Sequence, residues 1–164
     1  MGTDTACDTC ILINFALIDR IDLLTTLAEF RFCIPEDVWA EIERPDLRQV
    51  IEQYLRSGQL QLVRLDAPEE LALFAIYNQV LGKGESACLA IAENRGWAIA
   101  TDESKDRKWR RTIAGKKLQI LNTQTLILRS IRAGKISVQE ADAIKAMLEL
   151  NRFRLSISSF ADLL

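Results

Sequence analysis

Residues 84–102 read Gly-Glu-Ser-Ala-Cys-Leu-Ala-Ile-Ala-Glu-Asn-Arg-Gly-Trp-Ala-Ile-Ala-Thr-Asp, and this stretch decides the fold. The segment Ser86 to Ala92 combines strong helix formers with small side chains, which allow a helix to approach a sheet closely. The Asn-Arg-Gly sequence at 94–96 is typical of a helix end. The apolar run Trp97 to Thr101 predicts a strand, and Asp102 ends it. The stretch therefore predicts a helix that packs against a sheet and leads into one of its strands.

Short apolar runs outside this stretch continue the same alternation. They predict four more strands, at Thr5 to Cys7, Arg31 to Ile34, Leu60 to Leu65 and Leu118 to Leu121. A helical pattern follows each run, and alternating strands and helices indicate the α/β class with a parallel sheet.

Helix-start signals divide the chain in the same way. Each of the three prolines, Pro35, Pro45 and Pro68, stands where a helix can begin. Ser137 and Glu140 form a capping-box pattern, so we expect a last helix that starts near Ser137.

The composition is that of one globular domain over residues 1–164. About half of the residues are hydrophobic (49%), which is enough for a substantial core. No apolar run approaches the ~18 residues of a membrane span, and Met1 to Thr5 lack the features of a secretory signal. We therefore expect a soluble, cytoplasmic protein that does not associate with a membrane.

The absence of histidine limits the chemistry that this chain can perform. Without histidine the commonest general base, the usual serine or cysteine triads and most zinc sites are excluded. Any hydrolytic chemistry must then rest on carboxylates. The net charge of −2 also argues against a protein that coats nucleic acid through its overall field.

Four acids stand where a parallel sheet places its ligand site, beyond the carboxyl ends of the strands. Asp8 follows the first strand, Glu41 lies one turn into the helix after the second, Glu85 opens a helix and Asp102 ends a strand. Carboxylates can bridge two divalent ions roughly 3.5 to 4 Å apart for phosphodiester cleavage, without histidine. Each acid also has a simpler explanation, as a helix cap, a solvated helix residue or part of a turn.

The same residues carry a resemblance to PIN domains. The segment Ala6 to Asn14 resembles the opening strand, aspartate and helix of that family. Three later segments are similar to its second, third and fourth acidic motifs, namely Ile34 to Ile42, Leu81 to Ala87 and Ala100 to Glu103. The tail resembles a glutamate-bearing, VapC-like subgroup through Ala133 to Ser137 and Phe153 to Ser156.

The resemblance implies a PIN-like three-layer α/β/α fold with a central five-stranded parallel sheet, as a single nuclease domain over residues 1–164. It implies an endoribonuclease that depends on Mg²⁺ or Mn²⁺, in which Asp8, Glu41, Glu85 and Asp102 bind metal and catalyse cleavage of an RNA substrate. It also implies the toxin of a type II toxin–antitoxin pair, with an antitoxin protein and a second copy of the chain as partners.

Two departures from the family pattern leave the number of metal ions open. Residue 85 is glutamate where many relatives have aspartate, and Glu103 stands where an aspartate is usual. If a helix starts near Glu103, Asp106 is placed to supply a further ligand. Thr9 and Asn14 are candidates for hydrogen bonds to Asp8 or to a scissile phosphate.

Positive charge is concentrated just after Asp102. Lys105, Arg107, Lys108 and Arg111 are candidate RNA-binding residues, and Arg110, Lys116 and Lys117 extend the basic strip. An ordinary solvated helix face explains the pattern equally well. For Trp109 within this strip, inward packing is favoured over stacking on a base.

Alternative readings remain. One is a non-catalytic PIN-like module that binds nucleic acid or a partner. Another is a redox pair formed by Cys7 and Cys10, although Asp8 between them disfavours a thiolate. The apolar residues Ile21 to Leu27, Phe30, Phe32 and Trp39 either face a partner or belong to the core.

Overall fold

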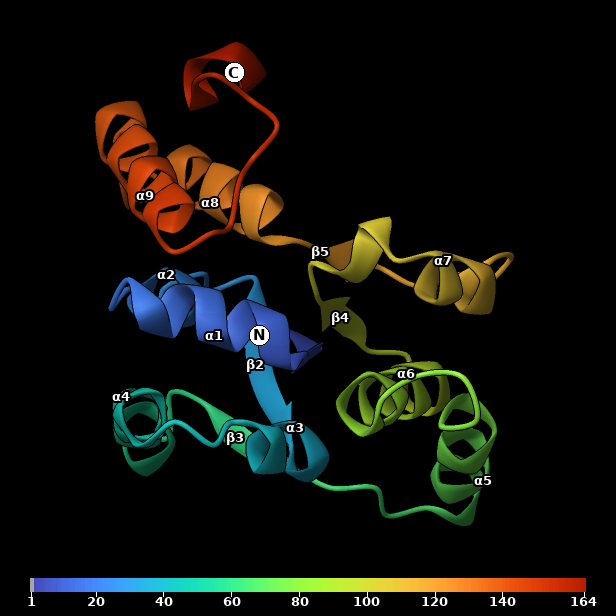
Figure 1. The fold of residues 1–164 in the computed structure, drawn as a ribbon. Helices are drawn as coiled ribbons and strands as arrows, with labels where there is room; N and C mark the ends of the chain where they lie inside the picture. The colour runs from blue at the N-terminus through green and yellow to red at the C-terminus, as the bar shows by residue number, and fades with distance from the viewer. Residues whose placement is uncertain (1) are drawn as a thin grey trace.

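The central sheet is built around β1 (Thr3–Cys7), which pairs with β2 (Phe30–Pro35) on one side and β4 (Ala98–Ala100) on the other. The computed structural model describes residues 2–164, apart from the side chain of Ser104. Within them the strand order is β3-β2-β1-β4-β5, with β3 at Gln61–Val63 and β5 at Ile120–Leu121 (Figure 1). All four pairings are parallel, so the predicted α/β class and five-stranded parallel sheet are confirmed.

Helices cover both faces of the sheet. In chain order they are α1 (Thr9–Leu17), α2 (Asp22–Thr25), α3 (Glu36–Glu41), α4 (Pro45–Arg56), α5 (Pro68–Tyr77), α6 (Lys83–Arg95), α7 (Arg107–Ile113), α8 (Thr123–Arg132) and α9 (Val138–Leu150). Two short 3₁₀ helices, η1 (Glu103–Lys105) and η2 (Phe160–Leu163), complete the described chain. Helices α1, α2, α8 and α9 lie on one side of the sheet, and α5 and α6 lie on the other (Figure 1).

The helix ends follow the signals in the sequence. Pro35 is the N-cap residue of α3, and Pro45 and Pro68 are the first residues of α4 and α5. The Ser137 hydroxyl accepts a hydrogen bond from the Glu140 amide at 3.0 Å, which starts α9 as predicted. That helix is not the last element, because η2 follows it, with the Ser159 hydroxyl accepting from the Ala161 amide.

Helix α6 is the most deeply buried helix of the fold. From Ala87 to Ala92 every side chain is at most 1% exposed, and the helix contacts β1, β2 and β4. Gly96 ends it with a φ of +70°, a left-handed conformation that favours glycine. Small side chains thus allow the close packing that the sequence predicted.

The apolar segments near the amino-terminal half belong to the core. Leu23, Leu24, Leu27, Phe30 and Phe32 are all buried, so the hypothesis that these residues face a partner is wrong. Trp39 is half-buried, and the Arg48 guanidinium lies 3.9 Å from the centre of its ring.

Trp109 is 1% exposed, which confirms that it packs inward. No helix in residues 2–164 is long and apolar enough to cross a membrane.

A buried ion pair joins the start of α5 to the end of α6. Glu70 is 1% exposed, and its carboxylate accepts hydrogen bonds from Arg95 Nε at 2.5 Å and from Asn94 Nδ2 at 3.1 Å. It also accepts from the Asp66 amide at 3.0 Å. The hydrogen bonds from Arg95 lower the pKa of Glu70 to about 2, although burial opposes this shift.

This pair predicts an acid-sensitive contribution to stability. Because the folded-state pKa of Glu70 lies below its ordinary value of 4.5, the contribution is present above that value and is lost as pH falls toward about 2. A shift of this size corresponds to roughly 3 kcal/mol. Urea unfolding at several pH values should show Glu70→Gln less stable than the wild type at pH 7, with the two converging near pH 2. A constant difference across that range would contradict this assignment.

Candidate metal centre

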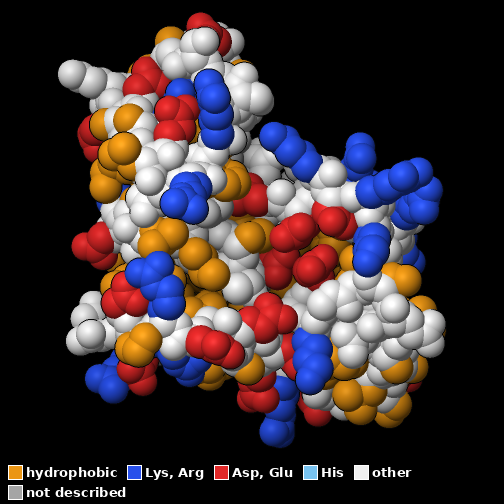
Figure 2. Space-filling view, viewed as in Figure 1, with side chains coloured by type: hydrophobic (Ala, Val, Ile, Leu, Met, Phe, Trp, Pro, Cys, Tyr) orange, Lys and Arg blue, Asp and Glu red, His pale blue; other side chains and the backbone are white. Residues whose placement is uncertain are grey.

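The carboxyl ends of the strands carry a cluster of acidic side chains. In Figure 2 these acids gather in a hollow near the middle of the visible face, and lysine and arginine side chains border it. The acids come from the residues that follow β1 and β4, from the end of α3 and from the first turn of α6. The acids therefore lie at the carboxyl ends of the strands, as the sequence predicted.

Asp8 lies at the centre of this cluster and is 3% exposed. It is the N-cap residue of α1, and its Oδ1 accepts a hydrogen bond from the Thr9 amide at 2.8 Å. Its Oδ2 accepts from the Thr101 hydroxyl at 3.0 Å. Burial raises the pKa of Asp8 despite these hydrogen bonds. The helix-capping role and a place in the acidic cluster thus belong to one residue.

Glu41 is held in place by two donors from other elements. The residue is the sixth and last of α3, which begins at Glu36, so it lies about one turn into the helix as predicted, and its side chain is exposed. Its Oε2 accepts from the Thr9 hydroxyl at 2.6 Å and its Oε1 from the Gly84 amide at 2.8 Å. A Cβ atom at Gly84 would lie 2.7 Å from Oε2, so only glycine allows this approach.

Glu85 lies near the other acids of the cluster, and they affect its pKa. It is half-buried in the first turn of α6, and its pKa is raised to about 7. Burial is the largest cause, followed by the negative charges of Asp8, Glu103, Asp106 and Glu41. The carboxylates therefore repel one another at this edge.

Glu103 is a member of the cluster that the sequence did not predict as a ligand. A carboxylate oxygen of Glu103, one of Asp8 and the Cys10 sulfur lie within 4.8 Å of one another. Thr101 links the two acids, because its hydroxyl donates to Asp8 and accepts from the Glu103 amide at 3.2 Å. The available signal was that Glu103 is a second acid directly after a strand.

Asp102 has different partners from the other predicted ligands. Its Oδ1 accepts from the Thr123 amide at 2.9 Å, and its Oδ2 accepts from the Thr123 hydroxyl at 2.5 Å and from Asn14 Nδ2 at 2.9 Å. Burial raises its pKa, and these hydrogen bonds oppose the shift. The side chain thus joins α1 to the start of α8.

The residues that the sequence predicted to assist the acids have hydrogen-bond partners that the sequence did not predict. The side chains of Thr9 and Asn14, which were candidates for hydrogen bonds to Asp8 or to a scissile phosphate, donate to Glu41 and Asp102 respectively. Asp106 caps α7 by accepting a hydrogen bond from the Trp109 amide at 2.8 Å, because only a 3₁₀ turn begins at Glu103. Its charge nevertheless raises the pKa of Glu85.

The cysteines do not form a redox pair of reactive thiols. Cys7 is fully buried, which raises its pKa well above the ordinary value. Burial, and next the charge of Asp8, raise the pKa of Cys10 to about 12. Both thiols are free in the described chain and stay protonated at neutral pH, so the redox hypothesis is wrong.

The basic strip borders the acidic cluster. Lys105, Arg107, Lys108 and Arg111 are exposed on η1 and at α7, directly after Glu103 in the chain. Figure 2 shows positive side chains along one side of the acidic hollow. The basic strip and the acidic cluster therefore lie side by side on one face of the molecule.

Comparison with known proteins agrees with the resemblance carried by the motifs. The profile of a family described as PIN domain matches residues 4–164, which include the sheet and every acid described above. No curated protein matches the chain significantly. The parallel sheet, the order of the acidic motifs and this match together show that the chain belongs to the PIN-domain family.

Proposed function

We propose that this protein is a single-domain endoribonuclease over residues 1–164 that depends on Mg²⁺ or Mn²⁺. The observation that carries the proposal is the gathering of carboxylates at the carboxyl ends of the strands, where oxygens of Asp8 and Glu103 lie within 4.8 Å of each other and Glu41 is held to Thr9 and Gly84. The pKa of Glu85 is raised first by burial and then by these neighbouring acids, which agrees with this arrangement. PIN domains are generally metal-dependent nucleases, and the acidic cluster of this chain fits a metal. Perturbed acids gathered at one place are typical of functional sites.

The donor set fits a hard divalent cation. The side chains that meet here are carboxylates, and oxygen ligands suit magnesium or manganese. The Cys10 sulfur is a soft donor, which magnesium and manganese bind poorly, so we do not count it among the ligands despite its position. A cation in this place would also relieve the repulsion between the acids.

We assign the direct contacts to Asp8, Glu41, Glu85 and Glu103. Asp8 and Glu41 are fixed by hydrogen bonds before any ligand arrives. Asp102, which the sequence placed among the ligands, we assign to positioning, because its carboxylate joins α1 to α8 and its charge is not among those that raise the pKa of Glu85. A bound divalent ion would activate water and stabilise charge on the scissile phosphate.

The surrounding residues support an RNA substrate and a toxin role. The exposed side chains of Lys105, Arg107, Lys108 and Arg111 can bind phosphates of the strand beside the acids. From the resemblance of the acidic motifs and the tail to the VapC-like subgroup, we further propose that the protein is a toxin, forms a homodimer and is inhibited by an antitoxin protein.

Removing single acids should abolish cleavage. We expect Asp8→Asn and Glu85→Gln each to lower the rate of metal-dependent RNA cleavage by more than about a hundredfold, since even outer partners of a metal site cost 10–100-fold. Glu69→Gln removes an exposed acid from α5 and should leave the rate unchanged. The assay follows a labelled RNA pool with Mg²⁺, Mn²⁺ or chelator. No cleavage by the wild type, with no thermal stabilisation by either ion, would favour the non-catalytic binding module.

The raised pKa of Glu85 predicts opposite effects of pH with and without metal. Between its ordinary value of 4.5 and about 7 the folded state holds a proton that the unfolded state has lost, so its contribution to metal-free stability decreases as pH rises. Mg²⁺ competes with that proton, so the rise in melting temperature caused by Mg²⁺ should be larger at pH 8 than at pH 6. In Glu85→Gln both pH effects should shrink. Equal behaviour of the variant and the wild type would refute this role.

Glu103 and Asp102 should differ in a thermal-shift assay. Glu103→Gln should keep or raise the metal-free melting temperature, because it removes a half-buried charge that its acidic neighbours repel, and it should lose most of the rise caused by Mn²⁺. Asp102→Asn should lower the metal-free melting temperature, because the Thr123 amide and hydroxyl lose a charged acceptor, at a cost of roughly 1–3 kcal/mol. It should retain a rise with Mn²⁺. The reverse pattern would make Asp102 the ligand.

A further inference from the structure

A second cavity lies directly beside the acidic cluster, on the other side of Asp102. Its volume is about 250 Å³. It is lined by Asp102, Lys105, Asn122, Gln124 and the segment Phe153 to Ser156. Residues from the end of β4, from η1, from the start of α8 and from the tail thus meet at one place.

The cavity wall carries two cations and one acid, so its net charge is positive, although Arg154, after Lys145, also lowers the pKa of the neighbouring Glu149 carboxyl. Lys105 and Arg154 are both exposed, and within the described chain neither lies within 4.0 Å of a carboxylate oxygen. The one acid in the wall, Asp102, already accepts hydrogen bonds from Asn14 and Thr123 on its two oxygens. An anionic group can therefore enter beside Lys105 and Arg154.

The other lining groups suit a nucleobase. Phe153 is half-buried, so it packs against the core while part of its side chain is accessible to solvent. Asn122 Oδ1 accepts from the Thr125 amide at 2.8 Å, which directs its Nδ2 donor elsewhere, and Gln124 adds a second amide. Stacking surfaces, amides and cations together are what proteins use for unpaired RNA bases. The volume lies below the roughly 300–1,000 Å³ of small-molecule sites, which favours a single nucleotide unit.

We propose that this cavity binds the nucleotide that flanks the scissile phosphate in a single strand of RNA. Lys105 and Arg154 contact its phosphate, Phe153 stacks on its base, and the amides of Asn122 and Gln124 contact the base edge. The assignment rests on the proposed nuclease function, because Asp102 and Glu103 are neighbours and place the cavity next to the acids. The tail segment Phe153 to Ser156 then contributes to substrate choice.

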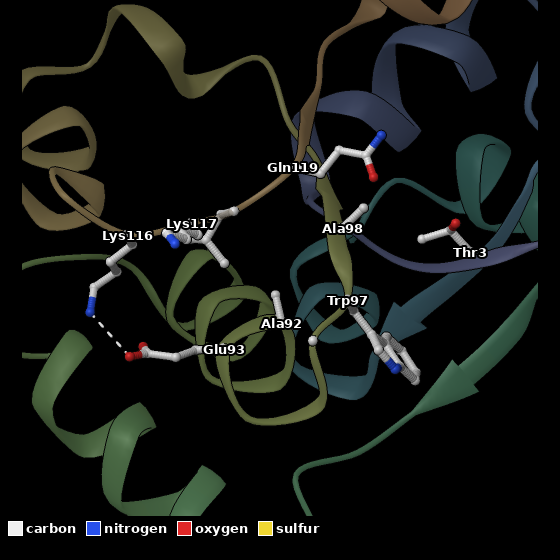
Figure 3. A pocket seen from close by; sticks show the side chains of 10 residues that line it. Thr3, Ala92, Glu93, Trp97, Ala98, Lys116, Lys117 and Gln119 are labelled. Carbon is white, nitrogen blue, oxygen red and sulfur yellow. Dashed lines mark hydrogen bonds and ion pairs between the residues drawn. The ribbon is translucent and has the colours of Figure 1, made fainter.

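A cavity at the opposite edge of the sheet provides a matched control. It has a volume of about 320 Å³ and is lined by residues at the beginnings of strands, among them Thr3 and Ala98 (Figure 3). It also holds two lysines, of which Lys116 is paired with Glu93 at 3.1 Å. The sequence placed Lys117 in the basic strip, but the structure places it in this cavity, with Thr3 and Ala98 at the beginnings of strands, so it does not belong to the RNA-binding surface. Lys117→Gln therefore removes one positive charge from a cavity at the other end of the strands from the acids.

The test measures binding, so that it does not depend on cleavage. Fluorescence anisotropy of a short fluorescein-labelled single-stranded RNA is recorded with the full-length protein in EDTA, across a series of salt concentrations. Arg154→Gln should weaken binding about fivefold at low salt and reduce the salt slope by about 0.7, the value for one phosphate contact on a single strand. Phe153→Leu should weaken binding about fivefold through lost stacking. Lys117→Gln should have no effect on affinity or slope.

The outcomes separate this inference from the nuclease proposal. Equal effects of Arg154→Gln and Lys117→Gln, or no effect of Arg154→Gln and Phe153→Leu, would overturn the nucleotide site even if RNA is cleaved. RNA binding that depends on Arg154 and Phe153, in a protein that never cleaves, would support the site and reject the nuclease. Because Phe153 packs against the core, its variant is compared at a temperature below its own unfolding transition, whereas Arg154 is exposed.

Discussion

Repulsion between carboxylates at one edge of the sheet is the constraint on which the rest of this structure depends. Asp8 is nearly inaccessible to water, and burial, followed by the negative charge of Asp8, raises the pKa of Glu85 and of Glu103. Such an arrangement opposes folding, so other elements must hold it. The rigid part is the buried centre of the sheet, where β1 lies between β2 and β4 and α6 packs across all three. A site with this cost is retained where something other than stability requires it.

Much of this arrangement could be predicted from the sequence, because it follows local patterns. The strand before Asp8, the buried helix after Glu85 and the helix starts at Pro68 and Ser137 all depend on neighbouring residues. Local patterns do not show which of the two acids, Asp102 or Glu103, meets Asp8. One residue separates them, and the 3₁₀ turn that begins at Glu103 decides which carboxylate meets Asp8. The sequence predicted correctly that the acids lie at the carboxyl ends of the strands, but it did not predict the direction of each side chain.

The partners of Thr9 and Asn14 were also beyond local reasoning. Thr9 meets an acid 32 positions away and Asn14 one 88 positions away, so these contacts exist only once the sheet has formed. The cysteines illustrate the converse. Their surroundings are apolar or acidic, and the same burial that forms the core removes their reactivity. A chain without histidine thus has carboxylates as its principal reactive groups near neutral pH.

The contact between Gly84 and Glu41 has a consequence for how this sequence can vary. Any side chain at position 84 would displace the Glu41 carboxylate, and a shorter acid at position 41 would leave the Gly84 amide without its acceptor. The effects of changes at the two positions are therefore non-additive. A side chain at position 84 would move the far end of the exposed Glu41 side chain rather than the backbone, so the effect of such a change falls on the place of this carboxylate in the acidic cluster. We therefore expect the residues at positions 41 and 84 to vary together in relatives of this protein.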